Sequence, residues 1–185
     1  YYNQNKISIE NIGELEEIIK FINSKDLSCV IAVYNSTVIA VYSIDTKNNM
    51  RLESEGVIKH LKEDYNIDCY ILSGDNNEVV KSSGEILGIS RENSFGGKNP
   101  EEKRQILTNL KNNNQSKVMM VGDGINDVLS LSEASFGVSF NPNSQLNLIS
   151  SDFVVIKEDL SLIISLIEIS NYTYYFIWIN LFWAF

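Results

Sequence analysis

Hydrophobic residues in the first third of the chain follow two different periods. Between residues 12 and 22 they recur every three or four positions, which predicts an amphipathic helix. Two β-branched runs follow at residues 29–34 and 38–44, and the polar Asn35-Ser36-Thr37 between them predicts a hairpin. Residues 50–65 return to helical spacing. The chain therefore begins with a helix and a hairpin and continues into a second helix.

From residue 69 onward, short apolar runs alternate with helical patterns. Strands are predicted at residues 69–72, 117–121, 136–140 and 152–156, and helices at 78–87, 100–110 and 126–134. Pro100 suits a first helical turn, and Asn112-Asn113-Asn114 predicts a solvated loop. Strand–helix alternation predicts an α/β fold, a Rossmann-like parallel sheet flanked by helices.

The end of the chain has a different pattern. Residues 160–169 are amphipathic, whereas 172–185 (YTYYFIWINLFWAF) are almost wholly apolar and aromatic. A membrane-spanning helix needs about 20 residues, and Tyr172, Tyr174, Tyr175 and Trp178 resemble an interfacial aromatic belt. We therefore expect the start of a transmembrane helix; the alternative is a buried C-terminal core helix.

Composition narrows the classes of function. The 185 residues are 44% hydrophobic and 21% charged, which suffices for a buried core. The formal net charge of −9 argues against nucleic acid as a partner, because no basic stripe can replace counterions. The start, YYNQNK, has neither a signal peptide nor an initiator Met, so we expect a portion of a longer protein.

An acidic loop, Gly122–Asp127 (GDGIND), follows the strand predicted at residues 117–121. Mg²⁺ takes oxygen ligands, usually one or two carboxylates together with phosphate and water. Asp123 can reach such an ion directly, and Asp127 can join it or orient a bound water. Asn126 adds a neutral donor. Taken alone, an acidic turn before a helix explains this loop equally well.

A second polar loop, Ser73–Asn76 (SGDN), follows the strand predicted at residues 69–72. A hydroxyl and successive backbone N–H groups after a strand can bind an anion, although a plain turn is the simpler interpretation. Lys103 could neutralise a phosphoryl group, but most lysines on helices are surface residues. Ligands of open α/β sheets bind at the carboxyl ends of strands, where both loops lie.

The three motifs, in this order, resemble the phosphorylation domain of P-type ATPases, within the haloacid-dehalogenase-like superfamily. Ser73-Gly74-Asp75 is similar to the family's Thr-Gly-Asp loop, Lys103 to its lysine, and Gly122–Asp127 to its hinge motif. The resemblance implies a haloacid-dehalogenase-like fold, Mg²⁺ as cofactor and ATP as substrate. It implies that an aspartate upstream of residue 1 is phosphorylated.

The resemblance also implies a role for each candidate residue. Phosphate would be bound by Ser73, Gly74, Asp75 and Asn126. Lys103 and Asp127 would be catalytic, and Asp123 and Asp127 would hold the metal.

The resemblance covers nearly the whole chain and implies its organisation. Residues 1–44 would be the C-terminal part of a nucleotide-binding domain, 45–158 a portion of the phosphorylation domain, and 159–185 a stalk with the start of a transmembrane helix. The ending NLFWAF resembles heavy-metal pumps, copper pumps above all. This implies a multi-pass membrane protein, mainly cytosolic in this portion, with the transported cation bound by membrane helices outside this chain.

Some positions depart from the family pattern. Leu129 stands where the family has Pro, and Asn171 where it has Arg. The phosphorylated motif Asp-Lys-Thr-Gly-Thr is absent, and Asp45-Thr46-Lys47 lacks its order. We therefore interpret Asp45 as a hinge residue and expect the chain alone to be inactive. The alternatives are a soluble phosphatase of the same superfamily that uses Asp45, and a non-catalytic interaction domain.

Overall fold

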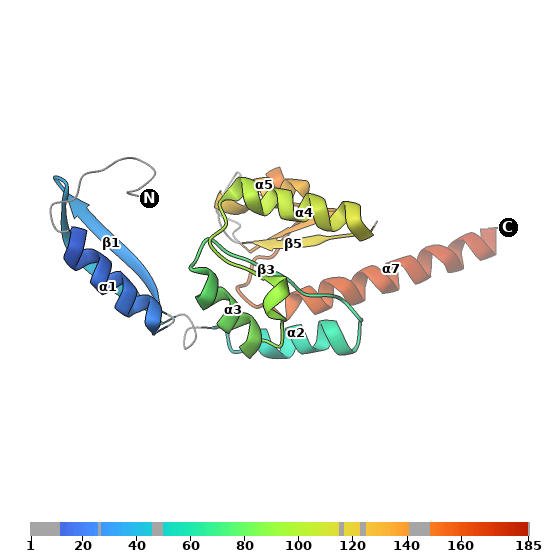
Figure 1. The fold of residues 1–185 in the computed structure, drawn as a ribbon. Helices are drawn as coiled ribbons and strands as arrows, with labels where there is room; N and C mark the ends of the chain where they lie inside the picture. Colours follow the sequence, from blue (N-terminus) through green and yellow to red (C-terminus); the bar gives the residue numbers. More distant parts are fainter. Residues whose placement is uncertain are drawn as a thin grey trace. The chain divides into compact units, whose positions relative to one another are not determined.

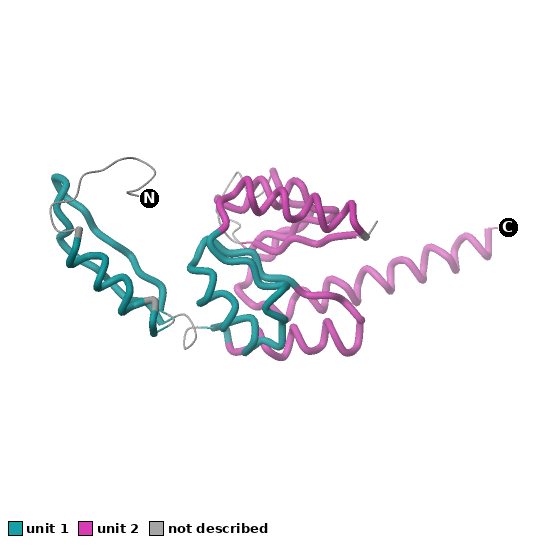
Figure 2. Tube along the Cα trace, in the orientation of Figure 1, with its two compact units in different colours: residues 1–51, 70–97 teal, residues 52–69, 98–185 magenta. Residues whose placement is uncertain are grey.

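The computed structural model describes residues 12–25, 27–45, 50–114, 117–122, 125–140 and 149–184. The chain divides into two compact units, one of residues 1–51 with 70–97 and the other of residues 52–69 with 98–185 (Figure 2).

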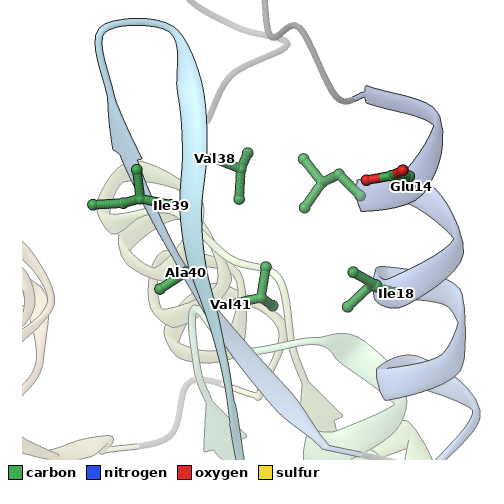
Figure 3. A pocket seen from close by; sticks show the side chains of 7 residues that line it. Glu14, Ile18, Val38, Ile39, Ala40 and Val41 are labelled. Carbon is green, nitrogen blue, oxygen red and sulfur yellow. The ribbon is translucent and has the colours of Figure 1, made fainter.

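The first unit opens with the predicted helix and hairpin. Helix α1 (Ile12–Ser24) precedes strands β1 (Ser28–Tyr34) and β2 (Thr37–Ile44), which pair antiparallel. Asn35 and Ser36 both have positive φ (44° and 64°), as a two-residue hairpin turn with the right-handed strand twist requires. Side chains of α1 face β2 across a hollow of about 330 Å³ (Figure 3).

The same unit holds a small parallel pair of strands. Strand β3 (Ile71–Leu72) pairs with β4 (Ser94–Phe95), and helix α3 (Asn77–Ile86) with a 3-10 turn at Arg91–Asn93 connects them. The sequence predicted a longer first strand and missed β4, because a two-residue strand carries no periodic pattern.

The second unit is a three-layer α/β arrangement. Strands β5 (Met119–Gly122), β6 (Phe136–Ser139) and β7 (Phe153–Val154) pair in parallel in that order. Helices α4 (Pro100–Asn114) and α5 (Val128–Glu133) lie side by side near β5 (Figure 1). Helix α2 (Ser54–Glu63) belongs to the same unit but lies apart from these two helices (Figure 1). The predicted parallel sheet flanked by helices is confirmed.

Strand alternation assigns each face of this sheet to a different helix. Val121 and Val138 are register partners, and both belong to the apolar cluster with Ile163 of α7 (Leu162–Ala184). On the alternate face, a Cβ at Gly137 would lie 2.8 Å from the carbonyl oxygen of Leu131 in α5. The sheet therefore lies between α5 and the first turns of α7.

Among the predicted boundaries that differ from the structure, two have an identifiable physical reason. The helix expected over residues 50–65 is α2, and Glu53 before it instead accepts a hydrogen bond from the backbone N–H of Leu160 (3.3 Å). The Asn112–Asn114 loop is the last turn of α4. Asparagine is a weak helix former, but the neighbouring Lys111 is bound to Glu133, and tertiary contacts override propensity.

Helix α7 confirms the expected apolar C-terminal helix and joins the two predicted segments into one. Within the described part of the chain it is the single helix long and apolar enough to cross a membrane. Its first turn is buried at Ile163, whereas Tyr172, Trp178 and Trp183 are 57–80% exposed. Only 6% of its apolar window is buried, unlike the core helix considered as the alternative.

We expect the burial of each leucine in α5 to determine how far its replacement by alanine lowers the free energy of unfolding. Leu131 is 1% exposed and Leu129 on the same helix is 46% exposed. Leu131→Ala should lower the free energy of unfolding by about 2–5 kcal/mol, and Leu129→Ala by no more than about 0.5 kcal/mol. Urea denaturation in mild detergent, followed by circular dichroism, measures both, and equal losses would contradict this packing.

Candidate functional site

A nearly buried ion pair joins two of the predicted motifs. The Lys103 Nζ lies 2.8 Å from Oδ1 of Asp127, and the two side chains are 11% and 14% exposed. Lys103 comes from the first turn of α4, and Asp127 ends the 3-10 turn Ile125–Asp127 that leads into α5. Most lysines on helices are surface residues, but Lys103 is nearly buried.

The end of β5 approaches this pair closely. A Cβ at Gly122 would lie 2.9 Å from Cβ and 3.0 Å from Oδ2 of Asp127. Any side chain at position 122 would therefore displace the carboxylate from Lys103. The glycine is needed here because Asp127 approaches the strand end closely.

The start of α4 is fixed by a reciprocal cap. The backbone N–H of Asn99 donates to the Glu102 carboxylate, and the N–H of Glu102 donates to Oδ1 of Asn99, both at 2.9 Å. Pro100 occupies the first helical position, where its missing N–H costs nothing. The cap fixes the start of the helix that carries Lys103. Its Asn-x-x-Glu signature is visible in the sequence, although we did not predict it.

The candidate metal ligands are only partly described. Asp123 and Gly124 lie outside the described residues, and Asn126 is exposed in the turn before α5. Among the residues that the structure does describe, no three His, Cys, Asp or Glu side chains cluster as a metal site. Mg²⁺ usually takes one or two carboxylates and completes its shell with phosphate and water, so the oxygen donors of Asp127 suit it.

The Ser73 loop lies in the first unit, between β3 and α3. The Ser73 hydroxyl accepts from the Asp75 backbone N–H (3.1 Å) and donates to Oδ2 of Asp75 (3.2 Å). Asn76 caps α3 by accepting from the N–H of Glu78 at 2.9 Å. Gly74 is exposed between them. The loop is thus an ordered turn that ends a strand and begins a helix.

A neighbouring glycine pair supports this loop and was missed by the sequence analysis. The Gly97 N–H donates to the carbonyl of Asp75, and the Gly96 N–H donates to Oδ1 of Asn77 (3.1 Å). A Cβ at Gly96 would lie 2.4 Å from Cα of Asn77. The Gly-Gly dipeptide was the available signal, since such pairs mark close backbone approach or positive φ, here 65° at Gly97.

Asp45 stands directly after β2, and Thr46 and Lys47 lie outside the described residues. Its interpretation as a hinge residue therefore stays a prediction.

Comparisons with known proteins agree on one family. Residues 2–135 match the family described as haloacid dehalogenase-like hydrolase. A probable copper-transporting P-type ATPase B from Staphylococcus epidermidis is 38% identical over 119 residues, which is 64% of this chain and 17% of that protein. The chain thus spans about a sixth of this relative's length.

Two solved structures are also similar. The first concerns the catalytic domain of a CPx-ATPase, CopB-B, and its changes upon nucleotide binding; it has a TM-score of 0.58 and 26% identity, over 70% of this chain and 48% of that one. The second, a zinc-transporting PIB-type ATPase in an E2.Pi state, has a TM-score of 0.53 and 26% identity, over 78% of this chain and 22% of that one.

We expect the glycine supporting the Ser73 loop to be far less tolerant than a glycine in open space. Gly96→Ala should lower the free energy of unfolding by about 1–3 kcal/mol, because its Cβ meets the Asn77 backbone. Gly56→Ala in α2, with nothing within 4 Å, should gain about 0.4–1 kcal/mol. Chemical denaturation compares them, and equal effects would refute the close packing.

Proposed function

The chain belongs to the haloacid dehalogenase-like hydrolase family, and from this we propose that it is the phosphorylation-domain portion of a P-type ATPase that transports a heavy metal. The observation that carries the proposal is the ion pair of Lys103 and Asp127 beside Gly122. It supports a site in which a cation and a carboxylate are held ready at a strand end. The similarity to P-type ATPases over most of the chain supports the same assignment.

Each motif would contribute one part of phosphoryl transfer from ATP to an upstream aspartate. Ser73 and Gly74 would hold phosphoryl oxygens through a hydroxyl and backbone N–H groups. Lys103 would offset their negative charge during transfer. Asp123 would hold Mg²⁺ with support from Asp127, and the bound ion would neutralise developing charge on the phosphoryl group.

Asp75 and Asn126 would complete the phosphate-binding set in different ways. Asp75 engages the Ser73 hydroxyl through Oδ2, so it would orient that hydroxyl rather than contact phosphate directly. Asn126, exposed beside Asp127, has an amide that could donate to a phosphoryl oxygen.

The proposed organisation follows the expected domains. Residues 1–44 would end a nucleotide-binding domain, 45–158 would form part of the phosphorylation domain, and 159–185 would lead into the membrane. Helix α7 supports the last assignment, because 23 residues span about 35 Å and most of its exposed side chains from Tyr172 onward are apolar or aromatic. The intact protein would be a multi-pass membrane protein, with this portion mainly on the cytosolic side.

The transported ion is proposed as copper. The named relative from Staphylococcus epidermidis is described as copper-transporting, whereas one structural neighbour is described as zinc-transporting. Heavy-metal transport is therefore better supported than the choice of ion. Assays of ATP hydrolysis by the intact protein with copper or zinc ions would separate the two.

We expect the acidic loop to bind Mg²⁺ through its carboxylates. Asp123→Ala should weaken Mg²⁺ binding by the chain about tenfold or more, because a direct oxygen ligand is lost. Asp64→Asn is the matched control, since Asp64 is an exposed carboxylate paired with His60. Calorimetric titration measures both variants. Equal affinity in the Asp123 variant and the wild type would favour a purely structural loop and a non-catalytic domain.

We also expect the 185-residue chain to hydrolyse neither ATP nor p-nitrophenyl phosphate with Mg²⁺, because the nucleophile would lie upstream. Phosphate release, compared between wild type and Asp45→Asn, measures this. Hydrolysis that disappears in the Asp45 variant would replace the proposal with the soluble phosphatase. A phosphatase has no use for α7, which makes this the weaker candidate.

A further inference from the structure

Two lysines of α4 hold the two ends of the short helix α5. Lys103 in the first turn of α4 contacts Asp127, directly before α5. Lys111, two turns later, donates to the carbonyl oxygen of Glu133 (2.6 Å) and to its Oε1 (3.2 Å), at the last residue of α5. The two helices lie side by side (Figure 1). Because the contacts join start to start and end to end, the helices run in the same direction.

The packing between these two contacts is tight. Positions 103, 107 and 111 are four residues apart, so they lie on one face of α4. Leu107 on that face is 2% exposed, and Ser130 and Leu131 of α5 are 0% and 1% exposed. Helix α5 has six residues and is too short to be stable by itself. Its position therefore depends on what it contacts on α4.

At the far end, Glu133 contacts a second cation of α4 as well as Lys111. Glu133 Oε2 lies 3.6 Å from Arg104 in addition to the Lys111 contact. The Lys111 hydrogen bond, with a smaller contribution from Arg104, holds the pKa of the Glu133 carboxyl below its usual range. A cation at the C-terminal end of a helix also offsets the partial negative charge of the last carbonyls. Lys111 thus satisfies both the side chain and the backbone of Glu133.

At the near end, Asp127 depends on this arrangement. As the residue before α5, it makes no side-chain cap hydrogen bond to the helix, and its Oδ1 is bound to Lys103 instead. Movement of α5 along α4 would therefore separate Asp127 from Lys103.

We propose that Lys111 and Glu133 are positioning residues, which fix the far end of α5 and thereby keep Asp127 within reach of Lys103. Neither residue belongs to the three motifs that carry the resemblance. The inference rests on the proposed function only for the chemical role of the Lys103–Asp127 pair. Its geometric part stands by itself.

Acetylation of lysines, read by mass spectrometry of the purified chain without Mg²⁺, tests the geometric part. The Lys103 side chain is 11% exposed and paired, so it should react slowly. Lys111→Met should raise the acetylation rate of Lys103 roughly three- to tenfold, because Glu133 then keeps only its longer contact with Arg104. Lys111→Arg keeps a charge and donors for both Glu133 oxygens, so it should restore protection. Glu133→Gln keeps the backbone carbonyl that accepts from Lys111, so it should raise the acetylation rate of Lys103 by an intermediate amount.

Glu101→Gln is the matched control. It removes an ion pair with Arg104 within α4 but leaves Lys111 and Glu133 joined, so Lys103 should stay protected. Circular dichroism of each variant reports unfolding, and exposed Lys59 in α2 reports the intrinsic acetylation rate. If Lys111→Met unfolds the chain, the milder Glu133→Gln variant provides the test. Wild-type acetylation of Lys103 in a folded Lys111→Met or Glu133→Gln variant would overturn the inference.

Mg²⁺ titration of the same variants distinguishes the two proposals. If the wild-type chain binds no Mg²⁺ but Lys103 responds to Lys111→Met, the proposed function fails and the positioning role stands. If Mg²⁺ binds at Asp123 but Lys103 does not respond, the positioning role alone fails.

Discussion

The ion pair of Lys103 and Asp127 is the constraint around which the second unit is arranged. Removing two charges from water costs several kcal/mol for each, so each of these side chains is tolerated inside only because the other is present. The pair needs the start of α4, the end of β5 and the start of α5 to meet at one point. Gly122 makes that meeting possible because its missing side chain leaves room for the carboxylate.

Strand β5 also packs against an apolar cluster on its other face. Val121 immediately precedes Gly122, and it packs against the cluster of Val138, Phe140 and Ile163. One strand end therefore carries a charged site, while the adjacent residue supports the base of the apolar helix α7. Strand alternation places these two environments one residue apart with no special loop between them.

The sequence predicted the features that depend on local pattern. The hairpin, the strand–helix alternation and the order of the three motifs follow from short-range spacing, and the structure has the corresponding elements. It did not predict β4, the helical Asn112–Asn114 turn or the support of the Ser73 loop by Gly96. These depend on contacts between distant segments, such as Lys111 with Glu133, which no periodicity within one segment encodes. The role of Asp123 stays a prediction, since it lies outside the described residues.

Helix α7 packs against the second unit at one end only. Its first turns pack in the cluster of Val138, Phe140 and Ile163, whereas most side chains of the remainder are exposed. If a helix of about 35 Å tilts by about 10° at its packed end, its far end moves by about 6 Å. A change of packing beside Val121 that tilts the first turns of α7 would therefore move the far end of the helix through a larger distance than the packed end.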